Sequence, residues 1–149
     1  MLSIRDTLTH LRQLRLSEAF NSERASEYLH RSTHGTGTKR ATDIGGTGHC
    51  PLTDYAGRYA QAREASIRAR READLLWKRI EPHLAQMDLD TRSVITEFYN
   101  MAMAWEDIPA SIKRSPKACE RMHQEAISQI ERQAMSLQYL EALKERRYP

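Results

Sequence analysis

One stretch of the sequence sets the helical register over a long segment. Between residues 55 and 80, apolar and small side chains recur at alternating steps of four and three residues. Such a seam is typical of a helix that packs along its length on another helix. It predicts one long helix over residues 54–83, which Pro82 ends or kinks because proline has no N–H to donate. The seam consists of Tyr55, Tyr59, Ala62, Ser66, Ala69, Ala73, Leu76 and Ile80. The cationic outer face of the same helix consists of Arg63, Arg68, Arg70 and Arg71.

The first 31 residues form another helical segment by the same criterion. Charged residues fall largely between apolar ones that recur at helical spacing. The pattern predicts an amphipathic helix from Ser3 to about Tyr28, broken once near Asn21. Its apolar positions are Ile4, Leu8, Leu11, Leu14 and Phe20.

A different composition separates these two helices. The stretch "RSTHGTGTKRATDIGGTGHCP" holds five of the six glycines in the chain, together with five threonines and a proline. Such residues gain little from burial and cost much to order. We therefore expect a flexible loop or linker over residues 32–53.

Residues 84–149 contain signals for three more helices. Asp90 is a good N-cap for the first, the second is expected from Trp105 to Ile112, and Ser115-Pro116 opens the last, which runs to about Arg146. The chain has 40 % hydrophobic but only 7 % aromatic residues, a balance that favours thin helical packing. The predicted fold class is all-α, with a C-terminal helix-turn-helix.

The stretch "AWEDIPASIKRSPKACERMHQEAISQI" supplies each part of that motif. A helix-turn-helix needs a short helix, a tight connection, and a second helix that buries one face and exposes the other. "KRS" is the connection, and apolar residues stand at helical spacing on both sides of it. These are Trp105, Ile108 and Ile112 before the turn, then Cys119, Met122, Ala126, Ile127 and Ile130.

The side chains left outside at the front of the second helix are the candidate DNA contacts. They are Lys113, Arg114, Ser115, Lys117, Glu120, Arg121 and Gln124. Four bases against one acid form a local excess that the net charge of +3 hides. We expect Lys113, Arg114 and Lys117 to contact phosphates, and Lys117, Arg121 and Gln124 to reach base edges. His123 lies on the inner or flanking face and is expected to be a packing residue.

The longer stretch "LDTRSVITEFYNMAMAWEDIPASIKRSPKACERMHQEAISQI" resembles the fourth region of sigma factors. It is more similar still to phage-encoded transcriptional regulators of the ArpU and RinA type. The resemblance covers roughly residues 84–132 and implies a DNA-binding transcription regulator encoded by a phage or prophage. The matching positions are Leu89, Val94, Ile95, Tyr99, Trp105, Glu106, Ile108, Ile112, Ser115, Lys117, Cys119, Arg121, His123 and Ala126.

The sequence departs from the family pattern at two positions. Pro109 stands where the pattern prefers alanine, so the first helix of the motif must start late or kink. Lys113 replaces the frequent turn glycine, which requires a different turn or a left-handed lysine.

Other site chemistries have weaker signals. Zinc needs four nitrogen or sulfur ligands, and His30, His34, His49 and Cys50 bracket the glycine-rich loop. However, His49 and Cys50 are adjacent, whereas structural zinc sites pair their ligands at short spacings, so we expect no metal. The "GTGT" and "GGTG" runs lack the G-K-[ST] of a phosphate-binding loop. No paired histidine or nucleophile accompanies the scattered carboxylates Asp90, Glu97, Glu106 and Asp107, so the sequence predicts neither an enzyme nor a cofactor.

The expected partner is double-stranded DNA. One alternative is a protein-interaction module that binds RNA polymerase or a sigma factor, and another is the DNA-recognition subunit of phage packaging machinery. The heptad helix and the C-terminal apolar residues Met135, Leu137, Leu140 and Leu143 suggest a homodimer, unless the seam packs within one chain. The two cysteines form no C-x-x-C pair, the N-terminus does not resemble a signal peptide, and no apolar run spans a bilayer, so we expect a cytoplasmic protein without membrane contact.

Overall fold

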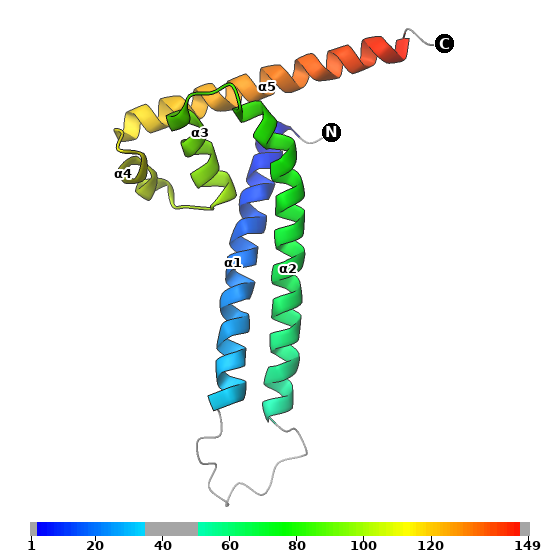
Figure 1. The fold of residues 1–149 in the computed structure, drawn as a ribbon, viewed down its shortest axis with the longest axis vertical. Helices are drawn as coiled ribbons and strands as arrows, with labels where there is room; N and C mark the ends of the chain where they lie inside the picture. The colour runs from blue at the N-terminus through cyan, green and yellow to red at the C-terminus, as the bar shows by residue number, and fades with distance from the viewer. Residues whose placement is uncertain (1–2, 35–50, 147–149) are drawn as a thin grey trace, which may run out of the picture. The chain divides into compact units, whose positions relative to one another are not determined.

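The structure, a computed structural model, describes residues 3–34 and 51–146 (Figure 1). These two ranges contain α-helices, one π-helical turn and one 3-10 turn, and no strand, so the predicted all-α fold class is confirmed. None of the helices in these ranges is long and apolar enough to cross a membrane. The elements are α1 (Ile4–His34), α2 (Pro51–Leu84), α3 (Leu89–Ile95), η1 (Thr96–Asn100), η2 (Trp105–Asp107), α4 (Ile108–Ile112) and α5 (Pro116–Arg146).

The chain divides into two compact units. Unit 1 consists of Met1–Arg15 and Ala73–Pro149, and unit 2 consists of Leu16–Glu72. Helices α1 and α2 therefore each contribute residues to both units.

Unit 1 contains the large buried side chains. The front of α5 packs on α3 and α4, as Figure 1 shows. One core cluster joins the first turns of α1 and the end of α2 to α3, η1 and α5: Leu8, Leu11, Ala73, Ile80, Leu84, Met87, Ile95, Tyr99, Ala126, Ile127 and Ile130. A second cluster, Val94, Ile108, Cys119 and Met122, holds α3, α4 and α5 together. Both clusters follow from apolar residues at helical spacing, which gain free energy when they leave water together.

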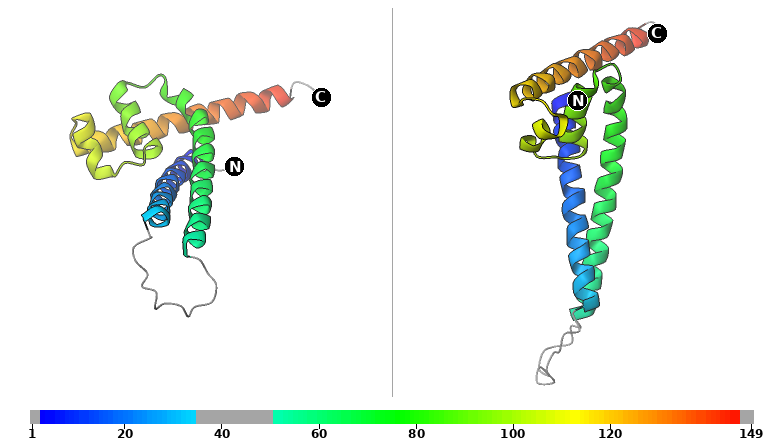
Figure 2. Two further views of the ribbon diagram at one scale, coloured as in Figure 1. Left: turned by 60° about the horizontal axis from the view of Figure 1, so that its bottom comes forward. Right: turned by 60° about the vertical axis from the view of Figure 1, so that its left-hand side comes forward.

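In unit 2, α1 and α2 lie side by side and run in opposite directions (Figures 1 and 2). The Ser66 hydroxyl donates to the Glu18 carbonyl at 3.1 Å, and the rings of Tyr28 and Tyr55 stack with centroids 6.4 Å apart. Each position of the predicted seam is buried or half-buried, and the four predicted outer arginines are exposed. The seam prediction is therefore confirmed.

Three predicted boundaries differ from the structure. Helix α1 is not broken near Asn21, whose side-chain amide donates to the Ser17 carbonyl at 2.8 Å and so stays within the helical turn. Helix α1 continues to His34 and α2 already begins at Pro51, so both enter the segment predicted to be a loop. The rest of that prediction, residues 35–50, lies outside the described residues. Pro82 lies inside α2, which ends two residues later at Leu84.

The start of α3 also differs from the prediction. Asp88, not Asp90, is the N-cap, because its carboxylate accepts hydrogen bonds from the Thr91 amide at 3.2 Å and the Thr91 hydroxyl at 2.7 Å. The bond from the Thr91 amide satisfies a backbone donor that the first turn would otherwise leave unpaired. Asp90 is thereby free for a different contact, described below.

Candidate nucleic-acid interface

The turn between α4 and α5 has a left-handed residue at its first position. Lys113 has φ 56° and ψ 45°, the strained alternative that the sequence allowed for a lysine in place of glycine. Pro109 lies in the first turn of α4, where no N–H is required, so the α-helix begins late, after the 3-10 turn η2. The predicted Ser115 cap is confirmed, since its hydroxyl accepts from the Ala118 amide at 3.2 Å.

The two faces of α5 differ as the sequence predicted. Cys119, Met122, Ala126, Ile127 and Ile130 are all buried. All seven candidate DNA contacts are exposed: Lys113, Arg114, Ser115, Lys117, Glu120, Arg121 and Gln124. The first turns of α5 are therefore anchored on one side and present polar side chains on the other.

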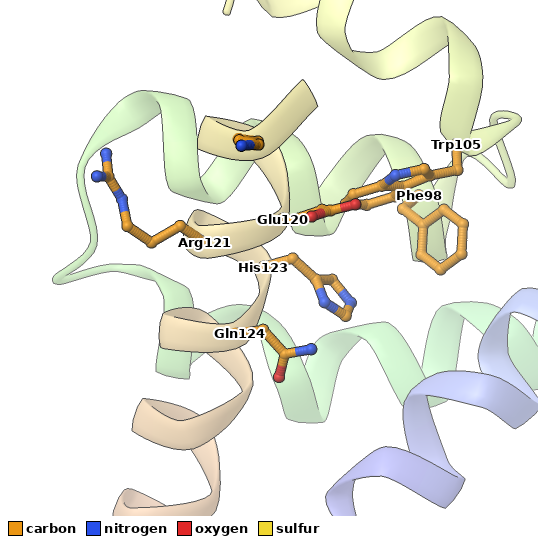
Figure 3. A pocket seen from close by; sticks show the side chains of 7 residues that line it. Phe98, Trp105, Glu120, Arg121, His123 and Gln124 are labelled. Carbon is orange, nitrogen blue, oxygen red and sulfur yellow. The ribbon is translucent and has the colours of Figure 1, made fainter. Parts of the chain in front are cut away.

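A hollow of about 570 Å³ lies beside this exposed face. Four of the candidate residues line it, namely Lys117, Glu120, Arg121 and Gln124, together with the rings of Phe98, Trp105 and His123. Figure 3 shows His123 pointing from α5 toward Phe98 and Trp105, whereas Arg121 points away from these rings. The hollow thus has an aromatic wall on one side and charged groups on the other.

His123 is a packing residue, as the sequence predicted. Its Nε2 shares a hydrogen bond of 2.8 Å with the Tyr99 hydroxyl, and its ring stacks on Tyr99 at a centroid distance of 5.7 Å. The rings of Phe98 and Trp105 meet it edge-on. Burial first, and then the charge of Arg5, lower the pKa of His123 below its ordinary value, so the ring is neutral at pH 7. Burial has the opposite effect on the phenol of Tyr99, whose pKa it raises.

Arg114 is already paired in the structure. Its Nε donates a hydrogen bond of 2.7 Å to the Asp90 carboxylate, and its Nη2 forms an ion pair with the same oxygen at 2.6 Å. Both side chains are partly exposed, so this ion pair contributes little to stability and competes with any phosphate contact of Arg114. The sequence did not indicate this pairing, because Asp90 lies in α3 and Arg114 lies in the turn between α4 and α5.

Residues of α1 hold the segment that carries Phe98 in place. The Nη1 atom of Arg12 donates hydrogen bonds to the carbonyl of Phe98 at 2.5 Å and to the carbonyl of Met103 at 2.9 Å. The guanidinium carbon lies 4.1 Å from the centre of the Phe98 ring. Arg15 donates to the Asn100 side-chain oxygen at 2.8 Å. These bonds satisfy carbonyl and amide oxygens near the π-helical turn η1, where the regular pattern of helical hydrogen bonds ends.

The residues weighed for other site chemistries lie as follows. Among the described residues, no group of three or more histidine, cysteine or acidic side chains is placed to hold a metal ion. The side chains of His34, His49 and Cys50 lie outside the described residues, so the structure does not test a zinc site formed by them. Glu97 has a structural contact, since it accepts a hydrogen bond from the Ser111 hydroxyl at 2.8 Å.

Comparison with known proteins gives no assignment. No protein-family model, no curated protein and no solved structure matches this chain. The resemblance to phage regulators and to the fourth region of sigma factors therefore stays a prediction from the sequence.

Proposed function

We propose that this chain is a sequence-specific DNA-binding transcriptional regulator, of phage or prophage origin as the resemblance implies, and that α4, the turn and α5 form its helix-turn-helix. The observation that carries the proposal is the exposure of Lys117, Arg121 and Gln124 on a helix whose opposite face is buried. Their spacing of four and three residues places them on one face over about 10 Å of helix. A major groove about 12 Å wide admits such a face.

The exposed residues have distinct expected roles. Arg121 suits the two acceptors of guanine, Gln124 suits adenine, and Glu120 suits the amino group of cytosine. Lys113 and Lys117 suit phosphates, which position the helix without reading sequence. Arg114 contributes less than a free arginine, because a phosphate must first replace Asp90 as its partner.

The N-terminal end of α4 does not favour the binding of a phosphate. Glu106 and Asp107 lie exposed in η2, at the start of the η2–α4 segment. Two carboxylates repel a phosphate at that helix start, although a helix N-terminus by itself attracts one. We therefore expect the backbone of DNA to contact the turn and α5.

Charge reversal on α5 tests the proposal. The double substitution Lys117→Glu and Arg121→Glu should remove binding to mixed-sequence duplex DNA and leave the helical circular-dichroism signal intact. The control, Arg92→Glu with Arg132→Glu, makes the same change of net charge at exposed positions away from the front of α5. For the parent protein, three or so phosphate contacts predict a slope of about −3 in log K against log salt. Equal loss in both double variants, or parent affinity that does not depend on salt, would contradict the proposal.

The aromatic hollow supports a second candidate, a module that binds a protein such as RNA polymerase or a sigma factor. Phe98 and Trp105 line the same hollow as Lys117 and Arg121, which suits an acidic segment with an apolar side chain. Trp105→Ala separates the two candidates, because it removes part of the aromatic wall but none of the expected DNA contacts. A variant that keeps DNA affinity and loses polymerase capture would support the second candidate. Assembly of the parent into rings would instead favour the packaging subunit.

A further inference from the structure

Unit 2 buries only small side chains in its described part. Its buried residues are three alanines, Ala25, Ala62 and Ala69. The larger aliphatic and phenylalanine side chains that the structure describes in this unit remain exposed, with relative exposures of 47 % for Leu16, 57 % for Phe20, 45 % for Leu29 and 41 % for Ile67. Two helices joined by an alanine seam bury little apolar area against the conformational entropy that they lose, so this hairpin has few internal contacts to stabilise it.

One side of the hairpin forms a groove of about 340 Å³. Its small lining residues are Ser22, Ala25, Ser26 and Ser66, its large apolar ones are Leu29 and Ile67, and Tyr59 and Arg63 complete the lining. The same surface therefore contains both protruding side chains and shallow places that accept them. A two-fold interface needs such self-complementarity, because the same patch is used by both copies.

We infer that this groove is covered by a second copy of the chain, so that two hairpins pack face to face as a four-helix bundle. In that arrangement Leu29 and Ile67 of each copy lie over the serine residues that line the groove of the other copy. The inference does not depend on the proposed DNA function, because it concerns residues of unit 2 alone.

The charge of the hairpin agrees with self-association. Residues 16–34 carry two basic and three acidic side chains, and residues 54–72 carry five basic and three acidic ones, a net charge of +1. Several of these charges pair within one helix, as in Arg58 with Asp54 and Arg68 with Glu64. A nearly neutral hairpin with mixed charges repels its own copy only weakly, although Arg63 places one positive charge in the groove lining, and it attracts nucleic acid only weakly.

The available area also suffices for a reversible dimer. A helical segment of residues 16–34 is about 28 Å long, and two helices side by side are roughly 20 Å wide. One face then covers roughly 550 Å² in each copy, or about 1,100 Å² in both, just above the area of about 1,000 Å² that a specific interface requires. We therefore expect an equilibrium between monomer and dimer that depends on protein concentration.

Sedimentation velocity of the full chain over a range of concentrations tests the inference. The parent should shift from monomer to dimer as concentration rises, whereas Ile67→Glu should remain monomeric. Leu16→Glu is the matched control, because Leu16 is similarly exposed but does not line the groove. Ser26→Arg provides a second variant, since it fills the exposed floor without removing an apolar contact.

The outcomes of this experiment are separable from those of the DNA experiment. A parent that is monomeric at every concentration would overturn the inference, and so would a dimer that survives both Ile67→Glu and Ser26→Arg. Circular dichroism identifies a variant that has lost its helices, and the other variant then decides. Failure of DNA binding leaves the sedimentation result unchanged, because no DNA is present.

Discussion

Replacement of Arg12 by alanine should destabilise unit 1 more than its position in an N-terminal helix suggests. The side chain donates hydrogen bonds of 2.5 and 2.9 Å to two carbonyls in unit 1 and lies over the Phe98 ring. A hydrogen bond from a charged donor contributes about 1.5 to 3 kcal/mol, and a cation over a ring adds about 0.5 to 1 kcal/mol. Because Arg12 is half-buried and one nitrogen makes both bonds, we expect a total loss of about 2 to 4 kcal/mol in the free energy of unfolding.

Tryptophan fluorescence during urea unfolding measures this loss of stability in unit 1. The two tryptophans of the chain, Trp77 and Trp105, both belong to unit 1. Arg5→Ala is the control on the same helix, since Arg5 is 60 % exposed and its ion pair with Glu131 should contribute at most about 1 kcal/mol. Arg12→Lys keeps the charge but not the planar guanidinium, so its loss should be intermediate. A loss below about 1 kcal/mol for Arg12→Ala, or one equal to that of Arg5→Ala, would refute the role assigned to Arg12.

Two further perturbations test the packing of α5. Burial lowers the pKa of His123 in the folded protein, so the unfolded chain binds the proton more readily and stability rises with pH. This contribution is complete above about pH 6.5, the ordinary value for histidine, and is lost as pH falls through the lower folded pKa. The loss of Tm between pH 7 and pH 5 should therefore be smaller in His123→Gln than in the parent, and equal losses would refute the effect. Removal of residues 136–149 should leave the Tm of unit 1 within about 2 °C of the parent value, because no described side chain after Ile130 is buried and surface changes have small effects. A larger fall in calorimetry would mean that Leu137 or Leu140 is covered.

Local patterns in the sequence predicted much of the fold and of the candidate interface. The spacing of apolar residues located the long seam of α2 and the buried stripe of α5. The Ser115-Pro116 pair located the start of α5, because a hydroxyl cap followed by proline matches the needs of a first helical turn. Lys113 was identified as either an altered turn or a left-handed residue, and it is left-handed.

Contacts between distant residues were not predictable in this way. Asp88 and Asp90 both suit a helix start, and Thr91 decides between them by donating two hydrogen bonds to Asp88. The pairing of Asp90 with Arg114 joins α3 to the turn between α4 and α5, and the contacts of Arg12 join residues more than 80 positions apart. Periodicity describes which side of a helix is apolar, but it does not identify the partner of a charged side chain.

The core of unit 1 shows why the segment from α3 to α5 depends on the first residues of α1. The resemblance covers only residues 84–132, yet Ile127 and Ile130 belong to the same cluster as Leu8 and Leu11. A segment that began at residue 84 would lose these partners, and burial of a leucine or isoleucine contributes about 1.5 to 3 kcal/mol. The exposed face of α5 therefore owes its position to the opposite, buried face, whose apolar partners lie partly in α1. Substitutions at Leu8 or Leu11 should thus weaken any activity of α5 through stability, whereas substitutions at Lys117 or Arg121 should do so through contact alone.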